Sequence, residues 1–73
     1  MANFSDRIKD LRTQQGMTQD ELGDIIGVKR YSVYTYEKGL NYPEVRNLII
    51  LADYFGVSLD YLVGRTDNPE INR

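Results

Sequence analysis

The sequence predicts an all-α fold, a compact bundle of five short helices, from three observations. Apolar residues recur with the 3.6-residue period of a helix, and no stretch alternates with period two for long enough to form a strand. Glycine or proline separates these periodic stretches at short intervals. The chain has 73 residues, 41% hydrophobic and 27% charged, without cysteine or histidine. That composition is typical of one small globular domain that folds without disulfides.

The first helix is expected from about Ser5 to Gln15, with Asn3 or Ser5 as its N-cap and Gly16 at its end. Its inward stripe is formed by residues three or four positions apart: Phe4, Ile8, Leu11 and Gln15.

The second helix is expected to follow Thr18. Thr18 and Glu21 have the spacing of a capping box, in which each side chain accepts a hydrogen bond from the other residue's backbone N–H. Met17 and Leu22 are spaced as a hydrophobic staple. Gly27 ends the helix, and its inward residues are Leu22, Ile25 and Ile26.

The third helix is expected from about Arg30 to Lys38, ending at Gly39. The fourth is expected to begin near Pro43, because proline suits a first helical position, and to end at Gly56. The fourth helix is expected to bury Leu48, Leu51, Ala52 and Phe55.

The fifth helix is short, begins after Ser58 and ends at Gly64, with Leu59, Leu62 and Val63 as its apolar residues. We expect residues 1–64 to form the domain and residues 65–73 to form a polar C-terminal tail. That tail contains Pro69 and is expected to fray.

The second and third helices have the pattern of a helix-turn-helix. Gly23 lies inside the second helix, where glycine costs about 1 kcal/mol relative to alanine, so we expect another helix to cross close to its backbone. Gly27 supplies the tight turn, and Val33 and Tyr36 follow at helical spacing on the buried side of the third helix.

The chain resembles the phage repressor and Cro type of helix-turn-helix domain, the Xre family, in three groups of residues. The first group holds the motif itself, Gln19–Val28, Ser32–Val33 and Tyr36–Gly39. The others are Arg7–Arg12 with Gly16–Thr18, and Leu51–Leu62. The similarity covers residues 4 to 65. It implies a lambda-repressor-like five-helix domain whose third helix enters the DNA major groove.

The resemblance also implies residue roles. Arg30, Tyr31 and Thr35 match base-contacting positions, and Gln19 matches a phosphate contact at a helix N-terminus. We expect the outward side chains of the third helix, opposite Val33, to be Arg30, Tyr31, Tyr34, Thr35 and Lys38. The base-contacting candidates are therefore Arg30, Tyr31, Tyr34 and Thr35. The phosphate-contacting candidates are Gln19, Lys29, Ser32, Lys38, Asn41, Tyr42 and Arg46.

Two positions depart from the family pattern. Lys29 stands where the family usually has a capping serine or threonine, which removes a cap worth roughly 1 kcal/mol and puts a cation at the positive end of a helix. A phosphate facing Lys29 would account for this. The loop Leu40–Glu44, often basic in the family, carries no basic residue here.

The resemblance further implies a structural ion pair and a dimer surface. Arg12 and Glu37 are expected to pair and join the first and third helices. Helix-turn-helix proteins usually bind DNA as two-fold dimers, and the family's contacts tend to lie at the fifth helix. Dimer candidates are Ile50, Leu59 and Tyr61, although all three could instead complete the core.

The expected function is therefore a sequence-specific transcriptional regulator, a repressor, that binds a near-palindromic double-stranded DNA operator as a homodimer in the cytoplasm. The alternative is a protein-interaction module, an antitoxin or adaptor with the same fold. An enzyme is not expected, because the chain lacks histidine, cysteine, a phosphate-binding glycine loop and a metal-ligand cluster. No cofactor, metal, membrane partner or small-molecule effector is expected.

The net charge of −2 favours the protein-binding alternative, but its distribution favours DNA. Residues 29–46 hold four basic and two acidic residues and so carry +2, whereas the segments before and after them each carry −2. We therefore expect modest non-specific affinity for DNA and a shallow salt dependence.

Overall fold

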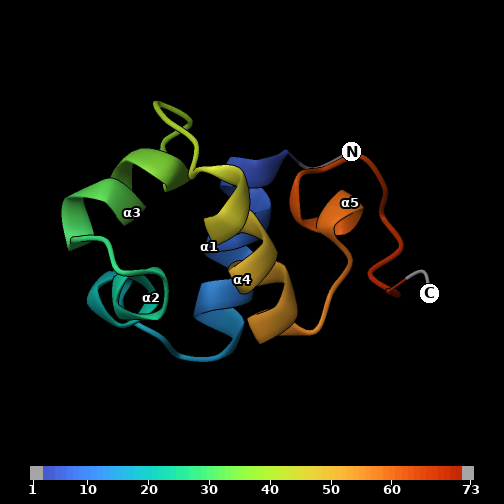
Figure 1. Ribbon diagram of the computed structural model, residues 1–73, viewed down its shortest axis with the longest axis horizontal. Helices are drawn as coiled ribbons and strands as arrows, with labels where there is room; N and C mark the ends of the chain where they lie inside the picture. Colours follow the sequence, from blue (N-terminus) through green and yellow to red (C-terminus); the bar gives the residue numbers. More distant parts are fainter. Residues whose placement is uncertain (1–2, 72–73) are drawn as a thin grey trace.

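The computed structural model describes residues 3–71, and within that range it contains five helices and no strand. Met1, Ala2, Asn72 and Arg73, which belong to the expected domain start and tail, lie outside the described residues. The helices are α1 (Phe4–Gln14), α2 (Gln19–Ile26), α3 (Arg30–Glu37), α4 (Val45–Phe55) and α5 (Leu59–Leu62). Figure 1 shows α2 and α3 at one end of the molecule, α5 at the other, and α1 and α4 between them.

Three helices begin at residues whose side chains accept a backbone N–H. Asn3 caps α1 by accepting from Asp6, so α1 begins one residue earlier than expected and Ser5 lies inside it. Thr18 and Glu21 form both hydrogen bonds of the capping box at α2. Ser58 caps α5. At α1 and α2 an acidic residue in the first turn also complements the helix dipole.

Helix α4 begins slightly later than the expected start near Pro43. Glu44 is the N-cap, and the helix begins at Val45. Pro43 instead lies before the cap with its ring buried, so its burial rather than its preset φ explains its position. The end at Gly56 is confirmed, with a left-handed φ of 67°.

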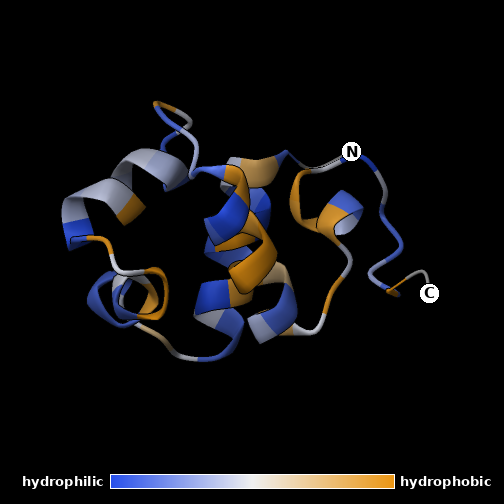
Figure 2. Ribbon diagram, in the orientation of Figure 1, coloured by the Kyte–Doolittle hydropathy of each residue, from blue (hydrophilic) through white to orange (hydrophobic). Residues whose placement is uncertain are grey.

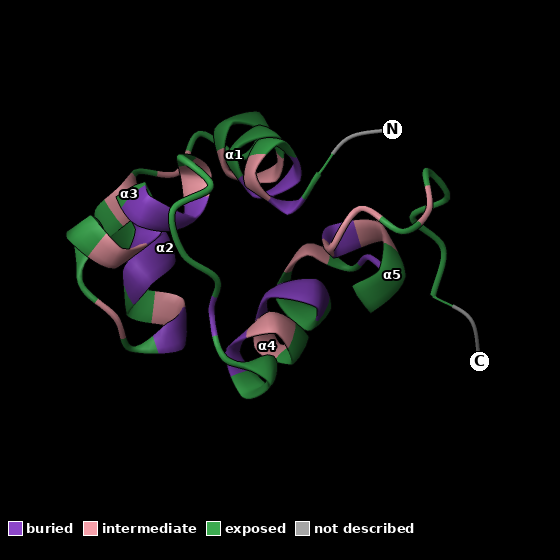
Figure 3. Ribbon diagram, turned by 90° about the horizontal axis from the view of Figure 1, so that it is seen from above, coloured by how far each residue is buried: buried purple, intermediate pink, exposed green. Residues whose placement is uncertain are grey.

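The core lies between α1, α4 and the helix-turn-helix pair. Its most buried members come from every helix and, for Val57, from the link between α4 and α5: Phe4, Ile8, Leu22, Ile26, Val33, Tyr36, Leu51, Ala52, Val57 and Leu62. Leu11, Ile25, Leu48 and Phe55 are only partly buried against this cluster, and Gln15 is exposed rather than inward. Figure 3 shows the buried segments facing the interior, and in Figure 2 helix α4 is more apolar than α3.

The turn between α2 and α3 explains Gly23. A Cβ at this position would lie 2.5 Å from the carbonyl oxygen of Val28, which belongs to the turn, and 3.5 Å from the Val33 side chain. The close neighbour is therefore the turn's backbone, while the crossing helix makes only ordinary contact. Gly27 adopts the left-handed conformation, with φ 72°, that lets the chain reverse there.

Part of the C-terminal segment, expected only as a polar tail, packs back against the domain. Arg7, which is buried in α1, donates hydrogen bonds to the carbonyl oxygen of Thr66 and to Asp67, at 3.3 and 3.1 Å. Its guanidinium also lies 3.8 Å from the centre of the Tyr61 ring. The Ser58 N–H donates to the Pro69 carbonyl oxygen. Sequence patterning indicated a polar tail, but a buried arginine needs acceptors, and this segment supplies them.

Within residues 3–71, no helix combines the length and the apolar character that crossing a membrane would require.

Candidate nucleic-acid interface

Helix α3 divides into a buried side and an exposed side. Val33 and Tyr36 are 0% and 5% exposed and belong to the core. Burial, followed by the negative charge of Glu44, raises the pKa of the Tyr36 hydroxyl above its ordinary value. The exposed side carries four of the expected outward residues: Arg30, Tyr31, Tyr34 and Lys38.

Thr35 is the exception among the expected outward residues. It is only 8% exposed, and its hydroxyl donates to the Ser32 carbonyl oxygen at 2.6 Å. The expectation that Thr35 projects outward is wrong, because the surrounding structure buries a side chain that helical period alone places away from Val33. A hydroxyl engaged with its own helix is not a free donor for a base edge.

Two tyrosines and a lysine form a continuous surface on the exposed side. The rings of Tyr31 and Tyr34 are stacked, with centroids 6.0 Å apart and planes at 27°. The Lys38 ammonium lies 5.7 Å from the Tyr34 ring centre, within the range of a cation–π contact. Tyr31 is 72% exposed. Folding alone therefore does not use this aromatic area.

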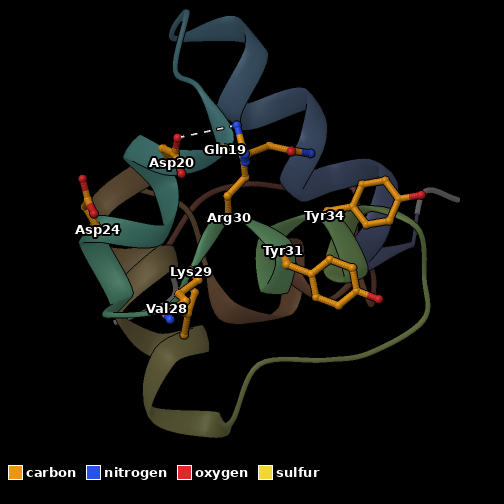
Figure 4. Close-up of a pocket in the computed structure, with 8 residues that line it drawn as sticks. All are labelled: Gln19, Asp20, Asp24, Val28, Lys29, Arg30, Tyr31 and Tyr34. Atoms are coloured by element: carbon orange, nitrogen blue, oxygen red, sulfur yellow. Dashed lines mark ion pairs between the residues drawn. The ribbon is translucent and has the colours of Figure 1, made fainter.

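An open groove runs between the start of α2 and the exposed side of α3 (Figure 4). The Arg30 side chain is turned towards the beginning of α2, where its Nη1 lies 3.9 Å from Asp20 Oδ2. Tyr31 and Tyr34 point to the other side. The residues that line the groove are Gln19, Asp20, Asp24, Val28, Lys29, Arg30, Tyr31 and Tyr34.

A buried network fixes the angle between three helices behind this groove. Arg12 donates from Nε and Nη2 to the two oxygens of Glu37, at 2.6 and 2.9 Å, and from Nη1 to the Met17 carbonyl oxygen. Only 13% of the Arg12 side chain and 4% of the Glu37 side chain are exposed. The hydrogen bond with Glu37 raises the pKa of Arg12, outweighing the opposite effect of burial. The ion pair that the resemblance implied is present.

Gln19 belongs to the same network. Its Nε2 donates to Glu37 Oε1 at 3.2 Å, and the side chain is half-buried. The side chain expected to contact phosphate is therefore held at the start of α2 by the structural pair. Sequence reasoning missed this link, because nothing in the spacing of Gln19 and Glu37 shows that α2 begins beside the end of α3.

Besides Gln19 and Lys38, which is exposed at the end of α3 outside the groove, the phosphate candidates fall into two groups. Lys29 lines the groove and is exposed, and in the described part of the chain its side chain makes no capping hydrogen bond to α3. Ser32 is half-buried on α3. The other three, Asn41, Tyr42 and Arg46, are exposed beyond the C-terminal end of α3 and do not line the groove.

The dimer candidates differ in exposure. Leu59 is 38% exposed, whereas Ile50 and Tyr61 are partly buried against the core, and Tyr61 also lies under Arg7. The exposed Ile49 lines a shallow hollow with Leu59. Helical period could have identified Ile49, because it lies two residues before the buried Leu51 and therefore on the opposite side of α4.

Asp20 and Asp24 also line the groove, although neither is among the residues predicted to form the site. Both are exposed, and the face they occupy is the one beside Lys29 and Arg30. Their spacing of four residues already puts them on one side of α2. Only the crossing of α2 and α3 shows which side of α3 they meet.

Comparison with known proteins gives a consistent result. The family model described as helix-turn-helix matches residues 8–62. The chain is 34% identical over 67 residues, 92% of its length, to the uncharacterized HTH-type transcriptional regulator YobD of Bacillus subtilis (strain 168), covering 60% of that protein. It is 34% identical over 64 residues, 88% of its length, to the cryptic phage CTXphi transcriptional repressor RstR of Vibrio cholerae, covering 58%.

Among solved structures, the chain is similar to the P22 c2 repressor in complex with a synthetic operator. The TM-score is 0.79 and the identity 27%, over 86% of this chain and 96% of that one. The chain spans about 60% of the length of the curated relatives it matches.

Proposed function

The chain belongs to the helix-turn-helix family of the phage repressor and Cro type, and from that premise we propose that it is a sequence-specific, double-stranded DNA-binding transcriptional regulator. The observation that carries the proposal is the exposed side of α3. Arg30, Tyr31, Tyr34 and Lys38 stand together there, and none of them is needed to close the core. The proposed activity is binding, without catalysis.

In this function α3 enters the major groove and α2 lies across the backbone. The Arg30 guanidinium can donate two hydrogen bonds to a guanine edge, and the tyrosine hydroxyls and rings can contact neighbouring bases or a thymine methyl. Lys29 and Lys38, at the two ends of α3, would contact phosphates on either side. Thr35 remains a base contact by resemblance alone, because its hydroxyl is engaged within the helix.

Gln19 is proposed to contact phosphate at the start of α2, where backbone N–H groups favour an anion. Its amide is held by Glu37, so the contact would be pre-organised rather than formed on binding. The exposed groups Asn41, Tyr42 and Arg46 would extend the phosphate contacts beyond α3.

We further propose that the protein acts as a repressor in the cytoplasm and binds its operator as a homodimer through a surface around Leu59. Support for repression comes from the names of two relatives, RstR and the P22 c2 repressor. Support for the dimer comes from size, since one small module contacts too few bases for a specific site. Light scattering that detects only monomer, with operator DNA present, would contradict the dimer.

The test of the function is selection of bound duplexes from a random pool by the purified 73-residue protein, followed by gel shift. We expect a near-palindromic consensus with a guanine at a fixed position in each half-site. A pool that shows no enrichment after repeated rounds would contradict DNA regulation and favour the alternative, a protein-interaction module such as an antitoxin or adaptor.

A further inference from the structure

Arg30, the residue best placed to contact a base, faces a carboxylate from the other helix of the motif. Its Nη1 lies 3.9 Å from Asp20 Oδ2, and 70% and 66% of the two side chains are exposed. Figure 4 shows Arg30 extended towards the first turn of α2 rather than along α3. The first turn of α3 itself contains no acidic residue, so the carboxylate that balances Arg30 comes from α2.

The distance between Arg30 and Asp20 allows electrostatic attraction but not a hydrogen bond. At 3.9 Å the two side chains attract each other electrostatically, but the contact is too long for a hydrogen bond. Asp20 therefore offsets much of the positive charge of Arg30 without engaging the guanidinium N–H groups, which stay free to donate. An exposed pair of this kind contributes little to stability.

Charge and hydrogen bonding matter differently for two kinds of DNA contact. Attraction to a phosphate depends chiefly on net positive charge and is the same for every sequence. Contact with a guanine edge depends on the planar fork of donors. A carboxylate beside Arg30 therefore weakens attraction to phosphates more than it weakens contact with a guanine edge.

Resting on the proposed function, we infer that Asp20 is a specificity-determining residue of the interface. It lowers the affinity of the groove for DNA of any sequence and leaves the guanidinium donors of Arg30 available for the preferred base. Asp24, four residues later in the same groove, adds a weaker effect of the same sign, because it carries the same charge but forms no ion pair with Arg30.

The test compares Asp20→Asn with the unaltered protein on two duplexes, the selected consensus and a scrambled version of it, at several salt concentrations. We expect the variant to bind the scrambled duplex about fivefold more tightly, with a salt slope steeper by up to about 0.9. Affinity for the consensus should change by less than about twofold, so that discrimination falls about threefold to fivefold.

Two matched variants separate position from net charge. Asp53→Asn makes the same charge change on the exposed side of α4, outside the groove, and should leave discrimination unchanged. Asp24→Asn should give an intermediate loss. Thermal unfolding verifies that all variants are folded.

Equal effects of Asp20→Asn and Asp53→Asn would overturn the inference, as would an Asp20→Asn variant that loses affinity for both duplexes alike. Either result would leave the proposed function standing, since the unaltered protein would still select its consensus. Failure of the unaltered protein to select any sequence would instead contradict the function and the inference together.

Discussion

Helix α3 carries an arginine–carboxylate pair at each end, and the two pairs differ in almost every physical respect. At the C-terminal end, Glu37 accepts two hydrogen bonds from Arg12 inside the protein, at 2.6 and 2.9 Å. At the N-terminal end, Arg30 lies 3.9 Å from Asp20 in solvent. The first pair joins helices, and its charged groups are not available to a partner molecule. The second holds its arginine loosely, with donors free.

The comparison shows that burial, rather than residue type, separates structural from functional charges in this domain. A buried pair is costly to break, because removing one partner leaves a charge away from water. An exposed pair is nearly neutral in stability and can be exchanged for contacts with another molecule. Each end of α3 can be tested by a substitution that changes mainly stability or mainly DNA binding.

The largest expected effect is that of Glu37→Ala. It leaves the buried Arg12 guanidinium without its carboxylate and releases Gln19, so the free energy of unfolding should fall by about 3 kcal/mol. Urea denaturation followed by circular dichroism measures this. Arg12→Met combined with Glu37→Met is the control, because it removes both charges and should cost less than Glu37→Ala alone. Equal losses would contradict the idea of a stranded charge.

At the opposite end, Arg30→Ala should reverse the pattern. We expect affinity for the consensus duplex to fall by about 1–3 kcal/mol, with preference relaxed at one base position. The free energy of unfolding should change by less than about 0.5 kcal/mol, since the side chain is exposed. Fluorescence anisotropy on a panel of single-base variants measures the first quantity. Unchanged preference at every position would remove Arg30 from the base contacts.

Lys29→Thr should separate stability from binding at a single residue. A threonine at the N-cap can accept an N–H from the first turn, so the free energy of unfolding should rise by about 0.5–1 kcal/mol. Affinity for all sequences should fall, and the salt slope should shrink by about 1, because one phosphate contact is lost. Lys9→Thr, an exposed lysine of α1, is the matched control for charge. A variant that gains stability and keeps its salt slope would show that Lys29 contacts no phosphate.

The smallest expected effect concerns the N-terminal cap of α2, the helix whose first residues contact both ends of α3 through Gln19 and Asp20. Hydrogen bonding to the Thr18 backbone and hydroxyl lowers the pKa of Glu21. A carboxylate with a lowered folded-state pKa stabilises the protein above its unfolded value of about 4.3, and this stabilisation disappears as the pH falls through the folded value. Glu21→Gln keeps the geometry of the cap but removes the charge. The urea midpoints of this variant and of the unaltered protein should therefore differ at neutral pH and converge in acid. A constant difference would contradict this.

The fold was largely predictable, because each helix carries its own signals. The capping box at Thr18 and Glu21, the left-handed glycines and the apolar periodicity are all local, and the structure contains each of them. The errors arose where a local rule met a tertiary contact. Pro43 has the φ of a first helical residue, but it is buried before the cap.

The candidate interface was predictable in membership but less so in arrangement. Helical period alone places Tyr31, Tyr34 and Thr35 away from Val33 and leaves Arg30, three residues before Val33, at the edge between the two sides. The argument failed for Thr35, because contacts that the helical pattern does not contain leave it only 8% exposed. The link from Gln19 to Glu37 and the position of Asp20 beside Arg30 depend on the crossing of two helices, which no local pattern contains.

The return of the C-terminal segment to α1 has a consequence for the order in which the domain assembles. The hydrogen bonds of Arg7 join residues 59 and 60 positions apart, whereas the other main helix contacts join helices that are adjacent or one apart in sequence. Closing so long a loop costs more chain entropy than any local turn, so this segment should dock last and detach first. Its detachment would remove the acceptors that hold Arg7 over Tyr61 and so loosen α5, while α2 and α3 stay folded. The surface proposed for self-association would then be lost in a partial opening that spares the DNA-contacting helices.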